Sequence, residues 1–184
     1  MSFNGDLNAS DDGLELETKG QIHTFSTENT ALDVGSNDYV LTADSTTATG
    51  LAWLDSGSIK HQVALVIACS DEETAIDATG QKISFRMPYA MTLNAGTAGI
   101  TGSLVTAGTG ANLFTVDINE SGSTILSTKL TFDATETTTT TAATPVVISD
   151  TALAADSIIT IDVDQLDSGG VAAGLKISLI GSVT

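Results

Sequence analysis

From about residue 60 to the end of the chain, apolar and polar residues alternate with the two-residue period of half-buried β-strands. The alternation is cleanest in four segments, whose apolar positions are Ile83, Phe85 and Met87; Phe114, Val116 and Ile118; Ile159, Ile161 and Val163; and Leu175, Ile177 and Leu179. The intervening positions, such as Ser84, Asp117, Asp162 and Lys176, are polar or charged. The pattern predicts antiparallel sheets with one buried face and one wet face.

Eight strands are expected in this region, at residues 61–69, 82–87, 99–106, 113–119, 123–132, 145–149, 157–163 and 173–180. The Gly-bearing segment 119–123 predicts a hairpin, 151–156 resembles a single helical turn, and the five threonines of 137–141 read as a solvated edge or extended connection. The spacing is typical of a β-sandwich. We expect an all-β protein whose antiparallel sandwich has jelly-roll order, with an immunoglobulin-like order left open.

Residues 1–58 have a different pattern of short alternating segments, at 18–25, 30–34, 38–42 and 51–54. Turn-forming stretches separate them, at 35–38 and 44–50. So few large apolar side chains bury too little surface to offset the entropy of ordering the chain. We therefore predict two parts, a docking and oligomerising segment at 1–58 and a sandwich domain at 59–184.

The charge of the chain excludes several classes of partner. Six Lys and Arg residues against 23 Asp and Glu residues give a formal net charge of -17, which would repel a nucleic acid or an anionic membrane surface. Hydrophobic residues make up 41% of the chain, which is too many for a disordered acidic tail. Aromatic residues make up only 4%, so the core should consist mainly of aliphatic side chains.

Neither a secretion signal nor a membrane span is expected. The first residues lack a basic stretch followed by an apolar one, and no segment approaches the ~18 apolar residues of a transmembrane helix. The single cysteine, Cys69, cannot form an intrachain disulfide. We interpret it as a small buried hydrophobic residue.

The residues do not indicate an enzyme. The only histidines are His23 and His61. His61 lies eight residues before Cys69 on one expected strand, which separates the two by roughly 26 Å and rules out a Cys-His pair. The sequence has no nucleophile elbow, phosphate-binding loop or zinc-protease motif. We predict no catalytic residues and no cofactor.

Two groups of carboxylates could in principle bind Ca²⁺. Asp162, Asp164 and Asp167 fall within six residues near a strand end, and a second group comprises Asp71, Glu72, Glu73 and Asp77. Neither has EF-hand spacing. Solvated strand faces and turns are the favoured interpretation, so no metal site is predicted. Bound Ca²⁺ in equilibrium dialysis would contradict that interpretation.

The only tryptophan, Trp53, lies near the boundary between the two predicted parts. With two tyrosines and five phenylalanines in the whole chain, no aromatic platform for a sugar is visible. A contact across a subunit interface, or a plug at one end of the sandwich, is the favoured role.

One segment resembles a known protein module. Leu32, Val34 and Gly35 form an L-x-V-G turn, residues 40–45 read V-L-T-A-D-S, and residues 49–53 read T-G-L-A-W. This succession is similar to a module of tailed-bacteriophage virion proteins, found in tail fibres, head fibres and capsid appendages. Tyr39 departs from it, standing where Gln is more usual. Residues 83–90, 114–120 and 158–164 also resemble a small β domain of phage structural proteins.

The resemblance implies a homotrimer in which each chain completes the core of the others. Its interface would include Leu32, Val34, Val40, Leu41, Leu51 and Trp53. It further implies a virion protein made in the host cytoplasm, a capsid decoration or head-fibre protein that contacts the major capsid protein or another virion protein. The alternative is a short tail fibre or receptor-binding protein, whose loops 94–99 and 108–112 would touch a host-surface glycan.

Overall fold

The computed structural model describes residues 16–27 and 29–183 of the chain. Its first compact unit ends at Ile59 and its second begins at Lys60, next to the predicted boundary between residues 58 and 59. The first 15 residues of the predicted oligomerising segment lie outside the described residues.

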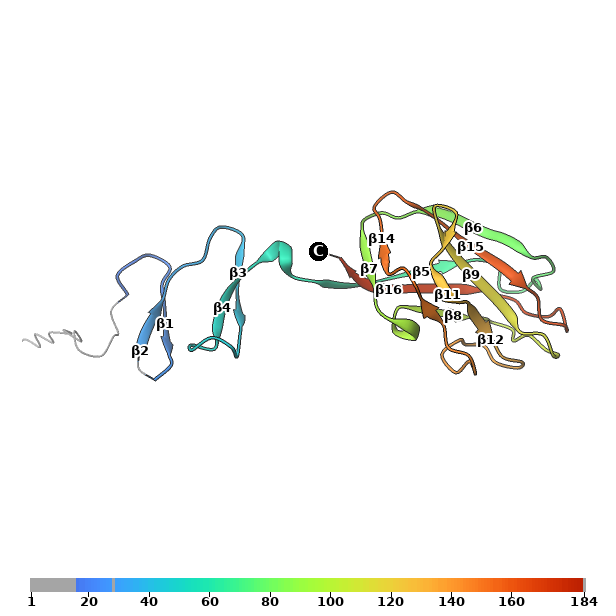
Figure 1. Ribbon diagram of the computed structural model, residues 1–184, viewed down its shortest axis with the longest axis horizontal. Helices are drawn as coiled ribbons and strands as arrows, with labels where there is room; N and C mark the ends of the chain where they lie inside the picture. Colours follow the sequence, from blue (N-terminus) through green and yellow to red (C-terminus); the bar gives the residue numbers. More distant parts are fainter. Residues whose placement is uncertain (1–15, 28, 184) are drawn as a thin grey trace, which may run out of the picture. The chain divides into compact units, whose positions relative to one another are not determined.

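The first unit consists of two antiparallel hairpins (Figure 1). Strand β1 (Ile22–Phe25) pairs with β2 (Asn29–Leu32), and β3 (Tyr39–Ala43) pairs with β4 (Leu51–Asp55). A short 3₁₀ turn, η1 (Ser56–Ser58), follows β4. The β3–β4 connection is closed by Asp44, whose Oδ1 accepts hydrogen bonds from the backbone N–H and the hydroxyl of Thr46, while Gly50 adopts a left-handed φ of 70°.

The second unit is a β-sandwich, so the prediction of an all-β fold is confirmed. One sheet contains β6 (Gly80–Arg86), β15 (Ile158–Gln165) and β9 (Phe114–Glu120), with β10 (Ser123–Thr124) and β12 (Leu130–Phe132) along the outer edge of β9. The other contains β5 (His61–Ala68), β16 (Lys176–Val183), β7 (Met91–Leu93), β8 (Ile100–Ser103) and β14 (Ala152–Leu153). Strands β11 (Leu126–Thr128) and β13 (Val147–Ile148) form a separate pair.

The strand order is that of a jelly roll. Strands β7 and β8 pair with successive parts of β16 and together occupy one strand position, and β10 and β12 do the same along β9. The eight positions then divide between the sheets. One sheet has the order first, eighth, third and sixth, and the other has the order second, seventh, fourth and fifth. This double Greek-key order is the one preferred from the sequence, rather than the immunoglobulin-like order.

The sandwich core is built from the alternating residues that the sequence indicated. The apolar positions of β9, β15 and β16 are almost fully buried, and their neighbours on the same strands face outward. The rings of Phe114 and Phe132 pack edge to face with centroids 5.9 Å apart. The predicted hairpin forms a two-residue turn at Ser121 and Gly122, both with positive φ, which suits the twist of the strands.

Three local predictions were wrong. Residues 123–132 form three short strands, β10, β11 and β12, in two different sheets rather than one strand. Residues 151–156 do not form a helical turn: Ala152 and Leu153 form β14 and pair with β7, a strand that the sequence did not indicate. The threonine run is not merely solvated, because Thr139 is only 2% exposed. Its hydroxyl accepts a 2.8 Å hydrogen bond from the backbone N–H of Gly102 on β8.

The loops at one end of the sandwich are interlocked by backbone hydrogen bonds. This end lies opposite the start of β5 and carries the connections 69–79, 104–113, 133–146 and 166–175. Bonds join 69–79 to 166–175, 104–113 to 133–146, and 104–113 to 166–175. The structure therefore holds the four connections as one layer.

Candidate functional site

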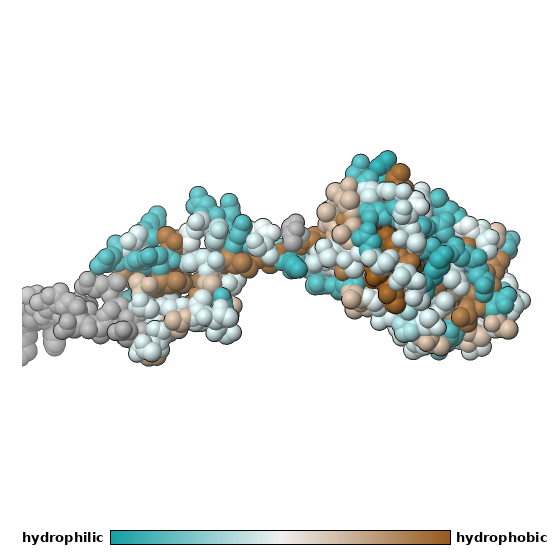
Figure 2. Space-filling model, viewed as in Figure 1, coloured by the Kyte–Doolittle hydropathy of each residue, from teal (hydrophilic) through white to brown (hydrophobic). Residues whose placement is uncertain are grey.

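The first unit exposes its apolar side chains. Phe25 is 66% exposed, and Val34, Tyr39, Val40 and Leu54 are also exposed. Figure 2 shows apolar surface, in brown, over the strands of this unit. Within residues 16–27 and 29–59, the one buried side chain among those described is that of Thr24, which contributes little apolar area. The described part of the unit therefore contains no buried large apolar side chain.

The structure places three of the six proposed interface residues, Leu41, Leu51 and Trp53, on one face of the β3–β4 hairpin. Leu41 lies directly opposite Trp53 in the β3–β4 register, and Leu51 lies on the same face of the hairpin. The indole Nε1 donates a 2.7 Å hydrogen bond to the carbonyl oxygen of Asp33. This bond ties the second hairpin to the segment that follows β2.

The backbone of Gly35 passes directly beneath the indole ring. A Cβ atom added at Gly35 would lie 2.7 Å from the Trp53 ring, which is closer than packed carbon atoms come. The L-x-V-G turn thus needs its glycine for a close approach rather than for an unusual φ. Leu32 ends β2, and Val34 lies in the same turn segment.

Val40 lies apart from this group. Its partner across the hairpin is Leu54, and both side chains lie on the face opposite Leu41 and Trp53. Both are exposed. The hairpin therefore has two apolar faces, a property that sequence spacing indicated only for the Trp53 side.

On the outer face of the sandwich, the carboxylates proposed as weak calcium ligands are bound by protein groups. Asp162 accepts hydrogen bonds from Asn119 and Thr160. Asp164 forms an ion pair with Lys129. The ammonium group of Lys129 also lies 3.0 Å from Asp117, a buried carboxylate directly opposite Asp162 in the strand register. Lys129 thus offsets repulsion between facing acidic strands.

Asp167, in contrast, is bound by backbone N–H groups of two loops. Its Oδ2 accepts hydrogen bonds from the backbone N–H groups of Thr109 and Val171, and its Oδ1 accepts one from Ala172. Burial raises the pKa of this carboxyl, but these donors, with Gly170, stabilise the charged form more strongly, so its pKa lies below the usual value. Asp167 locks two loops together.

The second acidic group is a loop with its own internal order. Asp71 accepts hydrogen bonds from the N–H groups of Thr74 and Glu73, which lower the pKa of its carboxyl. Glu72 forms an ion pair with Lys176. Across the part of the chain that the structure describes, no three His, Cys, Asp or Glu side chains are arranged to hold a metal ion.

His61 begins β5 and Cys69 directly follows its last residue, Ala68, so the two lie at opposite ends of this strand, as the sequence predicted. The thiol is buried, and this burial raises its pKa to about 12. Cys69 therefore packs as a buried, apolar side chain.

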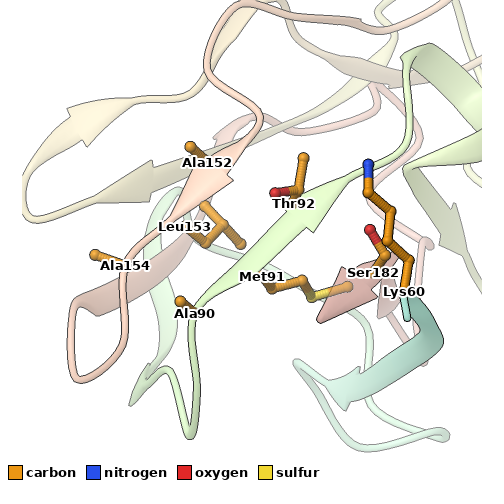
Figure 3. A pocket seen from close by; sticks show the side chains of 8 residues that line it. All are labelled: Lys60, Ala90, Met91, Thr92, Ala152, Leu153, Ala154 and Ser182. Atoms are coloured by element: carbon orange, nitrogen blue, oxygen red, sulfur yellow. The ribbon is translucent and has the colours of Figure 1, made fainter. Parts of the chain in front are cut away.

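A shallow pocket of about 300 Å³ opens beside β7 and β14 (Figure 3). Its apolar floor contains Met91 and Leu153, and polar groups of Lys60, Thr92 and Ser182 stand at its rim. Figure 3 shows Lys60 on the side away from the β14 residues. The lining residues include no histidine, cysteine, aspartate or glutamate.

Sequence reasoning missed Lys129 and Thr139. Lys129 is one of only six basic residues, and it lies in an expected strand of a sheet with acidic strands. This position could have indicated an ion pair. The contact between Thr139 and Gly102 joins residues 37 positions apart. Nothing in the threonine run distinguishes its third member.

No protein-family model, curated protein or solved structure matches the chain. Among residues 16–27 and 29–183, no helix is long and apolar enough to cross a membrane.

Proposed function

We propose that this chain is a homotrimeric structural protein on the surface of a tailed-bacteriophage particle, where it serves as a capsid decoration or head-fibre protein. Its first unit would trimerise and dock on the particle, and its sandwich would project outward. The proposal draws on the resemblance of residues 32–53 to the phage module. It draws equally on the physical state of the first unit.

The observation that carries the proposal is that no large apolar side chain is buried among the described residues up to Ile59. Phe25, Tyr39, Val40 and Leu54 are exposed in a single chain, whereas the sandwich buries Phe114, Phe132 and most of its aliphatic residues. Burial of apolar surface contributes roughly 25 cal/mol per Å². Association of several first units would supply the burial that one hairpin pair lacks, as in obligate interfaces.

A pair of matched substitutions tests the trimer. Val40 and Val147 are both exposed valines, one in the first unit and one in the sandwich. Val40→Lys should place a charge in the interface and shift the mass measured by light scattering toward that of one chain. Val147→Lys should leave the mass unchanged. Equal masses for both variants and the wild type would contradict a role for the β3–β4 hairpin in assembly.

Location on the particle tests the biological role. Immunogold labelling of intact particles with an antibody against the sandwich should decorate the head surface. Labelling of the tail alone would favour the alternative of a short tail fibre. Absence of label from purified particles that contain the protein's gene would contradict a virion role altogether.

One observation favours one of the two loops, 108–112, that the tail-fibre alternative requires. Residues 108–112 lie in the interlocked loop layer, where Ser168 Oγ accepts a hydrogen bond from the Ala111 N–H, and Gly169 donates one to the Thr109 carbonyl. A loop held in this way is preorganised for contact with a glycan. Residues 94–99, the other proposed loop, lie between β7 and β8 along a sheet edge and not in that layer.

A further inference from the structure

The sandwich has one long sheet edge without the usual protection. In the described part of the chain β5 pairs only with β16, so its other edge is free. None of the eight residues of β5 is Asp, Glu, Lys or Arg. Exposed edges without charge, proline or irregularity are templates for pairing with another strand.

The other sheet edges of the sandwich carry features that disfavour pairing with another strand. At the matching end of the second sheet, β6 carries Lys82 and Arg86, and its register with β15 shifts beside Ile161. Strands β10, β12 and β14 contain only two or three residues each. Among the described strands of the sandwich, β5 is therefore the one free edge that is long, regular and uncharged.

Hydrogen bonding along β5 identifies the groups that are free. Cys69 donates its N–H to the carbonyl of Leu175, which fixes the odd-numbered residues as those that bond to β16. The even-numbered residues then direct their N–H and C=O groups to the free edge. Their side chains are the exposed ones, and Val66 is the most exposed large hydrophobic residue there, at 67%.

The charges around β5 select the partner. The strand begins after Lys60, and Asp71, Glu72 and Glu73 follow its end. Two copies paired in parallel would place acidic ends side by side, whereas antiparallel copies would oppose each basic end to an acidic one. In a chain with net charge -17, this uncharged strand is also a place where two copies can touch with little repulsion.

We infer that β5 is a self-association surface at which two copies of the chain pair antiparallel, edge to edge, across a two-fold axis close to Leu65. In this register Ala64 lies opposite Val66 and Gln62 opposite Ala68, so every facing side chain is uncharged. Lys60 of each copy lies beside the acidic loop of the other. The pairing would join the β5-containing sheet of one copy to that of the other, as one continuous sheet.

This inference concerns the sandwich alone and does not depend on trimerisation of the first unit. A single strand edge buries less than the roughly 1,200 Å² of a stable interface. We therefore expect weak association in dilute solution and stronger association where copies are displayed close together. On a particle surface, the contact would link neighbouring protein assemblies.

Sedimentation velocity on the full chain over a wide concentration range tests the pairing. The base species, whether it contains one chain or three, should double in mass as the concentration rises. Val66→Lys should weaken the doubling at least about tenfold, since a strand edge with a charge resists pairing. Val147→Lys adds the same charge at another exposed valine and should not weaken it. No doubling of the wild type, or equal weakening by both variants, would overturn the inference.

A charge swap tests the antiparallel direction. Lys60→Glu and Glu73→Lys should each weaken the doubling, and the combined variant should restore it. Amide exchange gives a second readout: the N–H groups of Ala64 and Val66 should become protected as concentration rises, while those of Val63 and Leu65 are protected throughout. Failure of the combined variant to restore doubling, or unchanged exchange at Ala64 and Val66, would refute this arrangement.

Discussion

At the scale of single residues, the sandwich depends on a few buried charges that are fully partnered. Asp167 is the clearest, because it is 4% exposed and holds the loops at 104–113 and 166–175 together through backbone N–H groups. If a buried carboxylate loses its charge, its hydrogen bonds with these backbone N–H groups become weaker. The partners of Asp167 lie up to 58 residues away in the chain.

Asp167→Asn should lower the free energy of unfolding by about 1–3 kcal/mol at neutral pH, because charge-assisted hydrogen bonds become weaker neutral ones. Denaturant unfolding followed by circular dichroism measures the change. Asp77→Asn is the matched control, since that carboxylate is exposed and its loss should change little. Equal effects of the two substitutions would show that Asp167 does not act as a loop lock.

The pH dependence follows from the lowered pKa of Asp167. A carboxyl whose folded pKa lies below its unfolded value of 3.8 stabilises the fold above that value, and the contribution is lost as pH falls through the folded pKa. The difference in stability between wild type and Asp167→Asn should therefore narrow as pH falls below about 4. A difference that stays constant down to strongly acidic pH would be inconsistent with this linkage.

The second buried charge is Asp117, and the partly exposed Lys129 is its partner. The hydrogen bond to Asp164, and to a smaller extent that to Asp117, raises the pKa of the Lys129 ammonium group. The contribution of Lys129 to the stability of the fold is therefore present at neutral pH and is lost only as pH rises above the usual lysine pKa. Lys129→Met should lower the free energy of unfolding by about 1–2 kcal/mol, because buried Asp117 loses its partner. Partial exposure of Lys129 to water keeps this loss small. Adding Asp117→Asn should recover part of the loss. A double variant that is less stable than Lys129→Met would argue against this pairing.

At the scale of elements, the threonine run supports β8 by one buried contact. Thr139→Val keeps the side-chain shape but leaves the Gly102 N–H without its acceptor, so unfolding should become easier by about 1–3 kcal/mol. Thr140→Val is the control, because Thr140 is exposed. Thermal unfolding of the two variants compares them directly. If both melt alike, the Gly102 contact is not stabilising.

The Gly35–Trp53 contact is the corresponding test in the first unit. Gly35→Ala should push the indole aside and disrupt the link between the hairpins. Because Trp53 is the only tryptophan, its fluorescence reports on this unit alone. We expect a red-shifted emission at temperatures where the sandwich stays folded by far-ultraviolet circular dichroism. Unchanged Trp53 emission would show that the close approach is dispensable.

How well the sequence predicted an element depended on the length of its pattern. Strands β9 and β15 carry three inward apolar residues each, and their faces were predicted correctly. Strands β7 and β14 are three and two residues long, too short to show a period, and they form because they pair with each other. The candidate site followed the same rule: the face of Leu41 and Trp53 could be predicted, whereas the partners of Asp162 and Asp164 could not.

At the scale of the whole molecule, the chain joins two units with different degrees of self-sufficiency. The sandwich buries its own core and leaves no buried polar side-chain atom without a hydrogen-bond partner within the described residues. The first unit has well-formed hairpins but exposes the side chains that would stabilise them. Its stability should therefore depend strongly on protein concentration, whereas that of the sandwich should change only slightly, through the weak pairing at β5.

The most direct test is the mass of the purified full chain in solution, measured by light scattering after size exclusion, with amide exchange of β3 and β4 measured on the same sample. We predict a mass near three times 18.7 kDa and slow exchange in both strands. A stable species of 18.7 kDa whose β3 and β4 amides remain protected would contradict it, because the first unit would then hold its fold without other copies.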